Sequence, residues 1–122
     1  MVSLTASSLS TLVNDAGLAA ATAEAILDQA IDCLNLLGNL ELSNMQGTAA
    51  SKSVGVTSRE RGAILYVARA IYSSFYKDAP TTAVIAGLSV STTDVLSNAV
   101  VMHTVEAMAR KLHDADWSHA II

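Results

Sequence analysis

The sequence predicts a mainly α-helical protein: one domain over residues 1–122, built as a small bundle of about four helices. Hydrophobic residues make up 52% of the chain and charged residues only 15%, which excludes a disordered protein because disorder requires low hydrophobicity and high charge. Aromatic residues account for only 4%, so the apolar side chains are mostly aliphatic. In several segments they recur at spacings of three and four residues, as they do on one face of a helix.

The first two helices are predicted from residues that begin and end helices. A short helix over residues 6–16 has Thr5 as its N-cap and Gly17 in the stop position. A longer helix over residues 20–37 ends at Gly38.

Two faces of the second helix differ in chemistry. Its apolar stripe comprises Ala23, Ile26, Leu27, Ala30, Ile31, Leu34 and Leu37. The opposite, acidic face comprises Glu24, Asp28, Asp32 and Asn35.

Residues 40–57 predict no helix, because Gly47, Gly55 and a run of small polar residues interrupt the helical period. Around Val54 and Val56, apolar and polar side chains alternate as they do in a strand. A loop this long is uncommon in a compact domain unless it has a purpose. We expect either an extended arm or loose β-hairpin that docks on a partner through Val54 and Val56, or a mobile surface loop.

The third helix is predicted over residues 58–77, where Thr57 and Glu60 form a capping box and Pro80 enforces the end. Its apolar residues leave little polar face, so we expect this helix to be central. They are Ile64, Leu65, Val67, Ala68, Ile71, Tyr72 and Phe75.

A fourth helix is predicted over residues 92–115, opened by Ser91 and Asp94, with a turn of helix before it near residues 83–86. Its apolar residues wrap almost all the way around, so we expect it to be buried on two sides. Residues 113–122 are expected to form a C-terminal tail.

Charge is distributed unevenly along the chain. Residues 1–51 contain five acidic and no basic residues, whereas residues 52–122 contain seven basic and six acidic ones, so the net charge is −4. A dedicated nucleic-acid-binding domain is excluded, because it needs clustered Lys and Arg. We expect the acidic front and the basic middle to pair within one fold or between neighbouring copies.

The sequence contains no recognisable signal for secretion, membrane insertion or an internal disulfide. Its first residues lack a basic region followed by a continuous apolar one, no run reaches the ~20 apolar residues of a membrane span, and Cys33 is the single cysteine. We expect a soluble, non-secreted protein with no membrane partner. Cys33 is expected to be a buried core residue whose acidic surroundings raise its pKa.

No catalytic motif is present, neither a nucleophile elbow nor a glycine-rich phosphate loop. His103 and Glu106 lie three residues apart on the predicted fourth helix and form a polar pair, but zinc requires three or four ligands. Two His and two Asp also lie within residues 113–119. We predict no enzyme, cofactor or metal site; a metal- or ligand-binding bundle using these side chains is the alternative.

Arg59, Arg61 and Arg69 are the predicted interface cations, either for ion pairs between copies or for contact with DNA. Tyr72 and Tyr76 lie one turn apart and are either core residues or interface anchors, since tyrosine offers a large contact area at low entropic cost.

Three stretches in a fixed order form a wider pattern over about residues 4–112. They are Leu4-Thr5 before the first helix, residues 25–31 (AILDQAI) in the second, and residues 61–68 (RGAILYVA) through Tyr76 in the third. With the polar arm between the second and third helices, this pattern resembles the small head–tail connector (adaptor) proteins of tailed bacteriophages and tailed archaeal viruses.

The resemblance implies a non-enzymatic virion subunit at the head–tail junction. Members of the family form rings, commonly of twelve copies, between the portal and the tail or stopper, and DNA passes through the centre. It therefore implies a homo-oligomeric ring, portal and tail or stopper proteins as partners, and non-specific DNA contact in the lumen. The alternative is a small cytoplasmic helical regulatory or adaptor protein that dimerises through its last two helices.

Overall fold

Three helices form the body of the protein, and a short helix with a two-stranded sheet covers one side of them. The computed structural model describes residues 1–76 and 95–121, with the side chains of the last helix described as far as His113. In chain order the elements are β1 (Val2–Thr5), α1 (Ala6–Leu12), α2 (Ala20–Gly38), β2 (Ser53–Val56), α3 (Ser58–Ile71), the π-helix η1 (Tyr72–Tyr76) and α6 (Ala99–Ile121). The fold is mainly α, as predicted.

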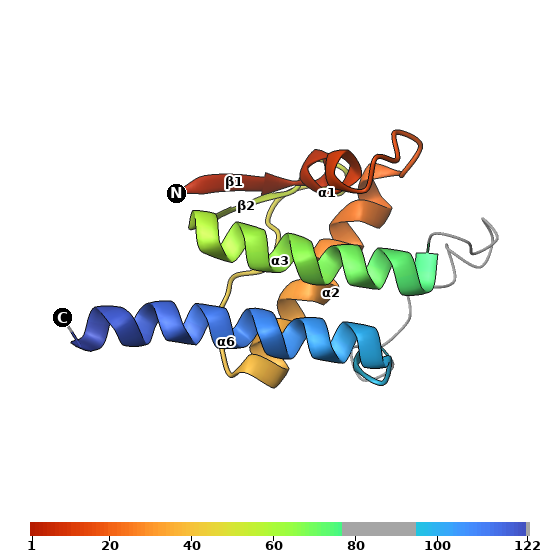
Figure 1. Cartoon of the computed structure of the whole chain (residues 1–122). Coiled ribbons are helices and arrows are strands. Elements are labelled where there is room, and N and C mark those ends of the chain that lie inside the picture. Colours follow the sequence, from red (N-terminus) through yellow and green to blue (C-terminus); the bar gives the residue numbers. More distant parts are fainter. Residues whose placement is uncertain (77–94, 122) are drawn as a thin grey trace.

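Helix α3 occupies the centre of the arrangement. In Figure 1, α3 and α6 run side by side, α2 crosses behind both, and α1 with the sheet lies along the other side of α3. Because α3 contacts α1, α2 and α6, the prediction of a central third helix is confirmed.

The capping signals predicted for α1 and α3 are present. Thr5 is the N-cap of α1, and its backbone N–H donates to the Ser8 hydroxyl at 3.1 Å. At α3, the Glu60 N–H donates to Thr57 Oγ1 at 3.1 Å and the Thr57 N–H donates to Glu60 Oε1 at 2.9 Å. This reciprocal pair satisfies two backbone donors that a helix start leaves open.

Each of the first two helices is followed by an asparagine in the left-handed backbone conformation. Helix α1 ends at Leu12 rather than near residue 16, because Asn14 adopts a φ of 55° and turns the chain before Gly17 is reached. Helix α2 ends at Gly38, as predicted, and is followed by Asn39 with a φ of 54°.

The last helix begins later and ends later than predicted. Its N-terminus is capped by Asn98, whose Oδ1 accepts from the backbone N–H groups of Val100 and Val101 at 3.0 and 3.2 Å. The predicted tail over residues 113–122 is wrong as far as Ile121, because α6 continues to that residue. The predicted opening pair of Ser91 and Asp94, like the turn near residues 83–86, lies outside the described residues.

Helix α6 buries one side within this chain, not the predicted two. Val101, Val105, Ala109 and Leu112 are buried against α2 and α3. Val100, on the outer side, is 62% exposed.

The sheet joins the N-terminus to the arm between α2 and α3. Strands β1 and β2 pair antiparallel, with Leu4 opposite Val54 and Val2 opposite Val56. Val54 and Val56 are buried beside Leu4 in the core. The strand predicted around these valines is confirmed, but their expected role in docking on a partner is wrong for this chain, since they dock on the chain's own β1 and core.

Residues 40–52, which we call the return segment, run back along α2 and cover its acidic face. The Glu24 carboxylate accepts from the backbone N–H groups of Ala50 and Lys52, each at 2.8 Å. Asp28 Oδ1 accepts from the Met45 N–H at 2.8 Å. The predicted acidic face of this helix is therefore partly a binding site for the return segment.

Two amides complete this attachment. The Asn35 side chain donates to the Leu42 carbonyl oxygen at 2.9 Å and accepts from the Leu42 N–H at 2.8 Å, as a backbone strand would. Asn44 Nδ2 donates to Asp32 Oδ1 at 3.0 Å. The return segment is thus hydrogen-bonded by four polar side chains of α2, namely Glu24, Asp28, Asp32 and Asn35.

Cys33 lies in the core that these elements enclose, as predicted. Burial first, and the neighbouring Asp32 carboxylate second, raise the pKa of its thiol to about 11. None of the helices in the described part of the chain combines the length and hydrophobicity that a bilayer crossing requires.

Candidate interaction face

One side of α3 and η1 presents a line of exposed side chains. Arg59, Gly62, Tyr66, Arg69 and Ser73 follow one another at spacings of three and four residues, and all five are exposed. Tyr66 is 58% exposed. We call these five residues the α3 face.

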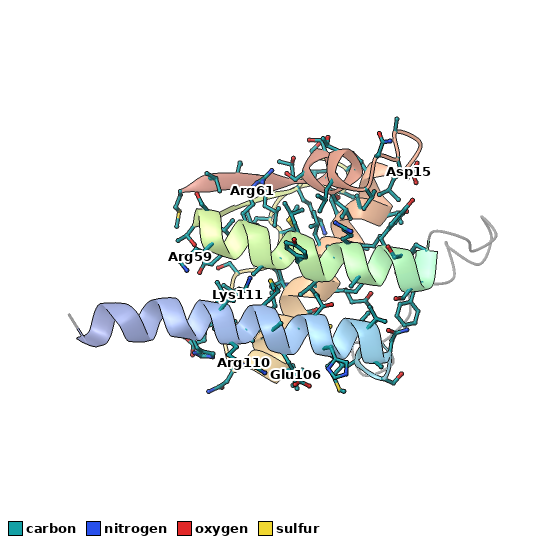
Figure 2. All side chains as sticks on the ribbon, in the orientation of Figure 1. Asp15, Arg59, Arg61, Glu106, Arg110 and Lys111 are labelled. Carbon is teal, nitrogen blue, oxygen red and sulfur yellow. The ribbon has the colours of Figure 1, made fainter. Side chains whose placement is uncertain are left out.

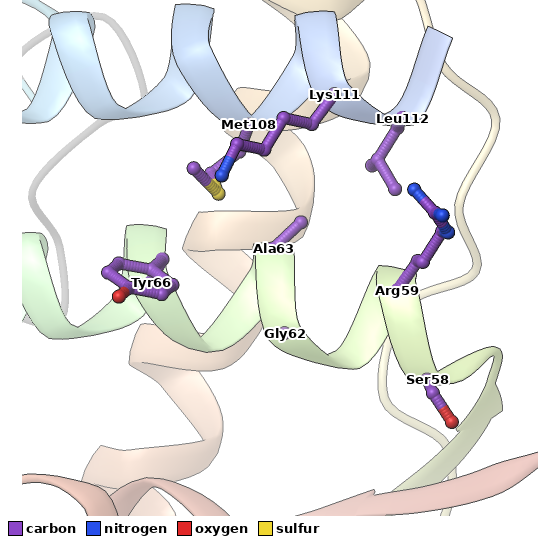
Figure 3. A pocket seen from close by; sticks show the side chains of 8 residues that line it. All are labelled: Ser58, Arg59, Gly62, Ala63, Tyr66, Met108, Lys111 and Leu112. Carbon is purple, nitrogen blue, oxygen red and sulfur yellow. The ribbon is translucent and has the colours of Figure 1, made fainter. Parts of the chain in front are cut away.

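A hollow of about 210 Å³ lies between the α3 face and α6. Figure 3 shows the Lys111 side chain extending from α6 along this hollow toward Met108 and Tyr66, while Arg59 reaches from the start of α3 toward Leu112. The lining residues, which include two cations and no carboxylate, are Ser58, Arg59, Gly62, Ala63, Tyr66, Met108, Lys111 and Leu112. We call this the α3/α6 hollow.

Further hollows lie between the α3 face and α1, on the flank of α3 away from α6. Leu12 and Leu65 line two of them together. Arg61 adds a cation beside the hydroxyl groups of α1, and Arg69 adds one beside Leu12. Figure 2 shows Arg61 on the α1 side of α3 and Lys111 on the α6 side, so basic residues flank α3 on both sides.

Two carboxylates of the described residues, one on α3 and one bonded to η1, are already hydrogen-bonded within the chain. Glu60, the one acidic residue of α3, belongs to the capping box. Asp15 accepts from the Tyr72 hydroxyl at 2.6 Å and from the Gly17 N–H at 3.1 Å. The five residues of the α3 face themselves include two cations and no carboxylate, although the whole chain carries a net charge of −4.

The seven predicted interface residues separate into two groups. Arg59 and Arg69 are exposed and Arg61 is half-buried. Four others lie in the chain's own core rather than on a free surface: Val54, Val56, Tyr72 and Tyr76.

The two tyrosines are core residues, the first of the two roles considered for them. The Tyr72 hydroxyl bonds to Asp15, and burial raises the pKa of Tyr76. Their expected role as interface anchors is corrected for this reason.

His103 and Glu106 lie on the outer part of α6, the first exposed and the second half-buried. Within the described residues, no three His, Cys, Asp or Glu side chains come together in a way that would hold a metal ion. His113 instead forms a hydrogen bond within the chain, with its Nε2 2.5 Å from the Gly38 carbonyl oxygen. The rest of the group within residues 113–119 lies outside the described side chains.

Sequence reasoning identified the arginines as interface residues but did not identify Gly62, Tyr66 or Lys111. One signal was available for two of these: Arg59, Gly62, Tyr66 and Arg69 share a helical face that omits every predicted core position of this helix. Lys111 had no such signal, because its place beside Tyr66 depends on how α6 packs against α3.

Comparison of the chain with protein-family models, with curated proteins and with solved structures found no match. Its function is therefore inferred from the α3 face and the distribution of charge around it.

Proposed function

We propose that this protein is a structural, non-enzymatic subunit that assembles with copies of itself into a ring of the head–tail adaptor type. In a virion, such a ring joins the portal to the tail or stopper and surrounds the DNA channel. The observation that carries the proposal is the α3 face, where an exposed tyrosine and apolar hollows are surrounded by basic side chains. These are Arg59, Arg61, Arg69 and Lys111.

The chemistry of this face suits a macromolecular partner. Tyrosine and arginine are the residue types most enriched in protein interfaces, because both bury a large area and keep a polar end that can be satisfied. The α3/α6 hollow, at about 210 Å³, is smaller than the roughly 300–1,000 Å³ of a small-molecule site. This hollow has room for a protruding side chain, while two of the hollows toward α1 are larger, at about 350 and 380 Å³.

The α1 side of the face suits the DNA of the channel. Arg61 lies beside the hydroxyl groups of Ser7, Ser8 and Thr11. Arginine and hydroxyl side chains contact phosphate groups without reading the base sequence. Such contacts match a ring through which any sequence must pass.

Size-exclusion chromatography with light scattering, followed by negative-stain electron microscopy, tests the proposal. We expect a particle mass many times the 12.7 kDa of one chain, and images with a central hole. A single species of 12.7 kDa at high concentration contradicts ring formation. Assembly that stops at two copies supports the regulatory dimer instead.

A further inference from the structure

The C-terminal end of α2 carries an exposed knob that is both apolar and acidic. Leu36 is 66% exposed and Leu37 is 44% exposed. Asp32 lies one helical turn before Leu36, and its Oδ1 also accepts from Asn44 Nδ2 at 3.0 Å. Glu41 follows just after the helix, and both carboxylates are exposed. We call Asp32, Leu36, Leu37 and Glu41 the α2 knob.

The α2 knob and the α3/α6 hollow lie on different sides of α6. Gly38 approaches α6 so closely that a Cβ at this position would lie 2.6 Å from the Cβ of Ala109, and it also bonds to His113. Met108 and Lys111 instead point toward α3 (Figure 3). A single folded copy therefore does not place its own knob in its own hollow.

Knob and hollow have opposite shape and opposite charge. The knob offers aliphatic side chains between two carboxylates. The hollow offers an apolar floor of Ala63, Met108 and Leu112 between two cations, Arg59 and Lys111. Opposite charges around an apolar contact favour one partner and one orientation.

We propose that the α2 knob of one copy docks in the α3/α6 hollow of the next copy. Leu36 then lies against Met108, Leu112 and the ring of Tyr66. Asp32 and Glu41 lie opposite Arg59 and Lys111. This inference rests on the proposed function, because both require a second copy of the chain, and it names the surfaces through which the copies meet.

The contact joins unlike surfaces and therefore repeats. Each copy that uses its knob keeps its hollow open, and a head-to-tail contact of this kind closes into a ring when the rotation between copies allows it. A self-complementary contact would stop at two copies.

Two variants test the two surfaces independently. A knob variant carries Leu36→Ser and Glu41→Lys, and a hollow variant carries Gly62→Leu and Lys111→Glu. Nothing lies within 4 Å of a Cβ built at Gly62, which lines the hollow, so a side chain at this position starts in open space. We expect each variant alone to associate at least about tenfold more weakly than the unmodified chain, since burial of one leucine side chain contributes roughly 1.5–3 kcal/mol.

Matched controls carry the same kinds of change elsewhere. Val100→Ser removes an exposed apolar side chain at the start of α6, and Arg110→Glu reverses a charge on the side of α6 away from the hollow (Figure 2). Both controls are expected to associate as the unmodified chain does. Circular dichroism melts confirm that all four proteins are folded.

Mixing the two variants gives the decisive result. The knob variant keeps an intact hollow and the hollow variant keeps an intact knob, so a mixture is expected to form one-to-one dimers that grow no further. At a concentration where each weakened variant alone is monomeric at 12.7 kDa, light scattering of the mixture is expected to give about twice that mass.

Three outcomes overturn the inference. If both variants assemble like the unmodified chain, the copies meet elsewhere while the ring itself stands. If the mixture stays monomeric, the contact between knob and hollow does not exist. If the unmodified chain does not associate at all, the proposed function fails together with this inference.

Discussion

At the scale of single residues, one buried carboxylate holds the end of the return segment. The Glu24 side chain is only 2% exposed, and its two oxygens each accept one backbone N–H, from Ala50 and from Lys52. Charge-assisted hydrogen bonds of this kind are about twice as strong as neutral ones. They hold the chain where Ala50 adopts a φ of 71°, a conformation that alanine disfavours.

Replacement of this carboxylate by an amide tests its role. Glu24→Gln leaves one oxygen and places an NH₂ group against a backbone donor, so we expect a loss of about 2–3 kcal/mol in the free energy of unfolding. Urea denaturation measures it. The matched control Glu41→Gln, at an exposed site, is expected to change the stability by no more than about 0.5 kcal/mol when both changes are made in the hollow variant, where association does not contribute. Equal effects of the two changes contradict a structural role for Glu24.

Cys33 provides a second test at a single residue, through its reactivity and its pH dependence. Because burial raises the pKa of its thiol from 9.0 to about 11, we expect slow labelling by a thiol reagent in the folded protein and fast labelling in urea. The unfolded state loses the thiol proton at a lower pH than the folded state. Stability is therefore full below pH 9 and falls as the pH rises from 9 to about 11.

Cys33→Ala separates this effect from the titration of Tyr76, which burial also shifts upward. The alkaline loss of stability, followed by urea denaturation at several pH values, is expected to be smaller in the variant than in the unmodified chain. If stability falls with pH in the same way in both proteins, burial does not raise the pKa of the Cys33 thiol.

At the scale of elements, two glycines in helices have opposite roles. Gly38 ends α2 where that helix meets α6, and an added Cβ there would lie 2.6 Å from the Cβ of Ala109. Gly62 lies on the exposed side of α3 with open space around it. Gly38 permits a close contact between two helices, whereas Gly62 weakens the helix in which it lies.

Alanine at each position is expected to change the stability in opposite directions. Gly62→Ala stabilises the fold by up to about 1 kcal/mol, because alanine favours helix and meets no neighbour. Gly38→Ala destabilises it by about 1–3 kcal/mol, because the two helices must move apart. Thermal melts of both variants measure the effect. A stabilised Gly38→Ala protein would show that α2 and α6 do not meet closely.

The predictable elements were those whose signals lie within one helical turn. The capping box of Thr57 with Glu60 and the stop at Gly38 each depend on residues that are close in sequence, and both are confirmed. The pairing of β2 with β1 was not predictable, because alternation around Val54 identifies a strand but not its partner some fifty residues away. The same limit applies to the α3/α6 hollow, which two helices distant in sequence form together.

At the scale of the whole molecule, acidic and basic side chains differ in how they are used. Carboxylates of α2 are hydrogen-bonded within the chain, whereas most cations of α3 and α6 are exposed. The carboxylates of α2 bind the return segment, most fully at Glu24 and Asp28. The cations of α3 and α6 face outward. A chain of net charge −4 therefore presents a face with exposed cations, and among the described residues the exposed carboxylates are Asp32 and Glu41, which we propose as partners of those cations.

Sodium chloride is expected to weaken the association of copies but to have little effect on the folding of each copy. Ion pairs at a partly exposed contact between copies are screened as the Debye length falls from about 10 Å at 0.1 M to about 3 Å at 1 M salt. The buried bonds of Glu24 are screened much less. We therefore expect sodium chloride to weaken association, measured by light scattering, while the melting temperature of the monomeric hollow variant changes little.

Neutral replacements show whether these charges cause the salt effect. A chain with Arg59→Gln and Lys111→Gln keeps the apolar floor of the hollow but loses its cations, so its weaker association is expected to depend less on salt. Arg110→Gln, the control, keeps the full dependence. If the unmodified chain associates more tightly as sodium chloride rises, apolar burial dominates the contact, and ion pairs of Arg59 and Lys111 do not hold the copies together.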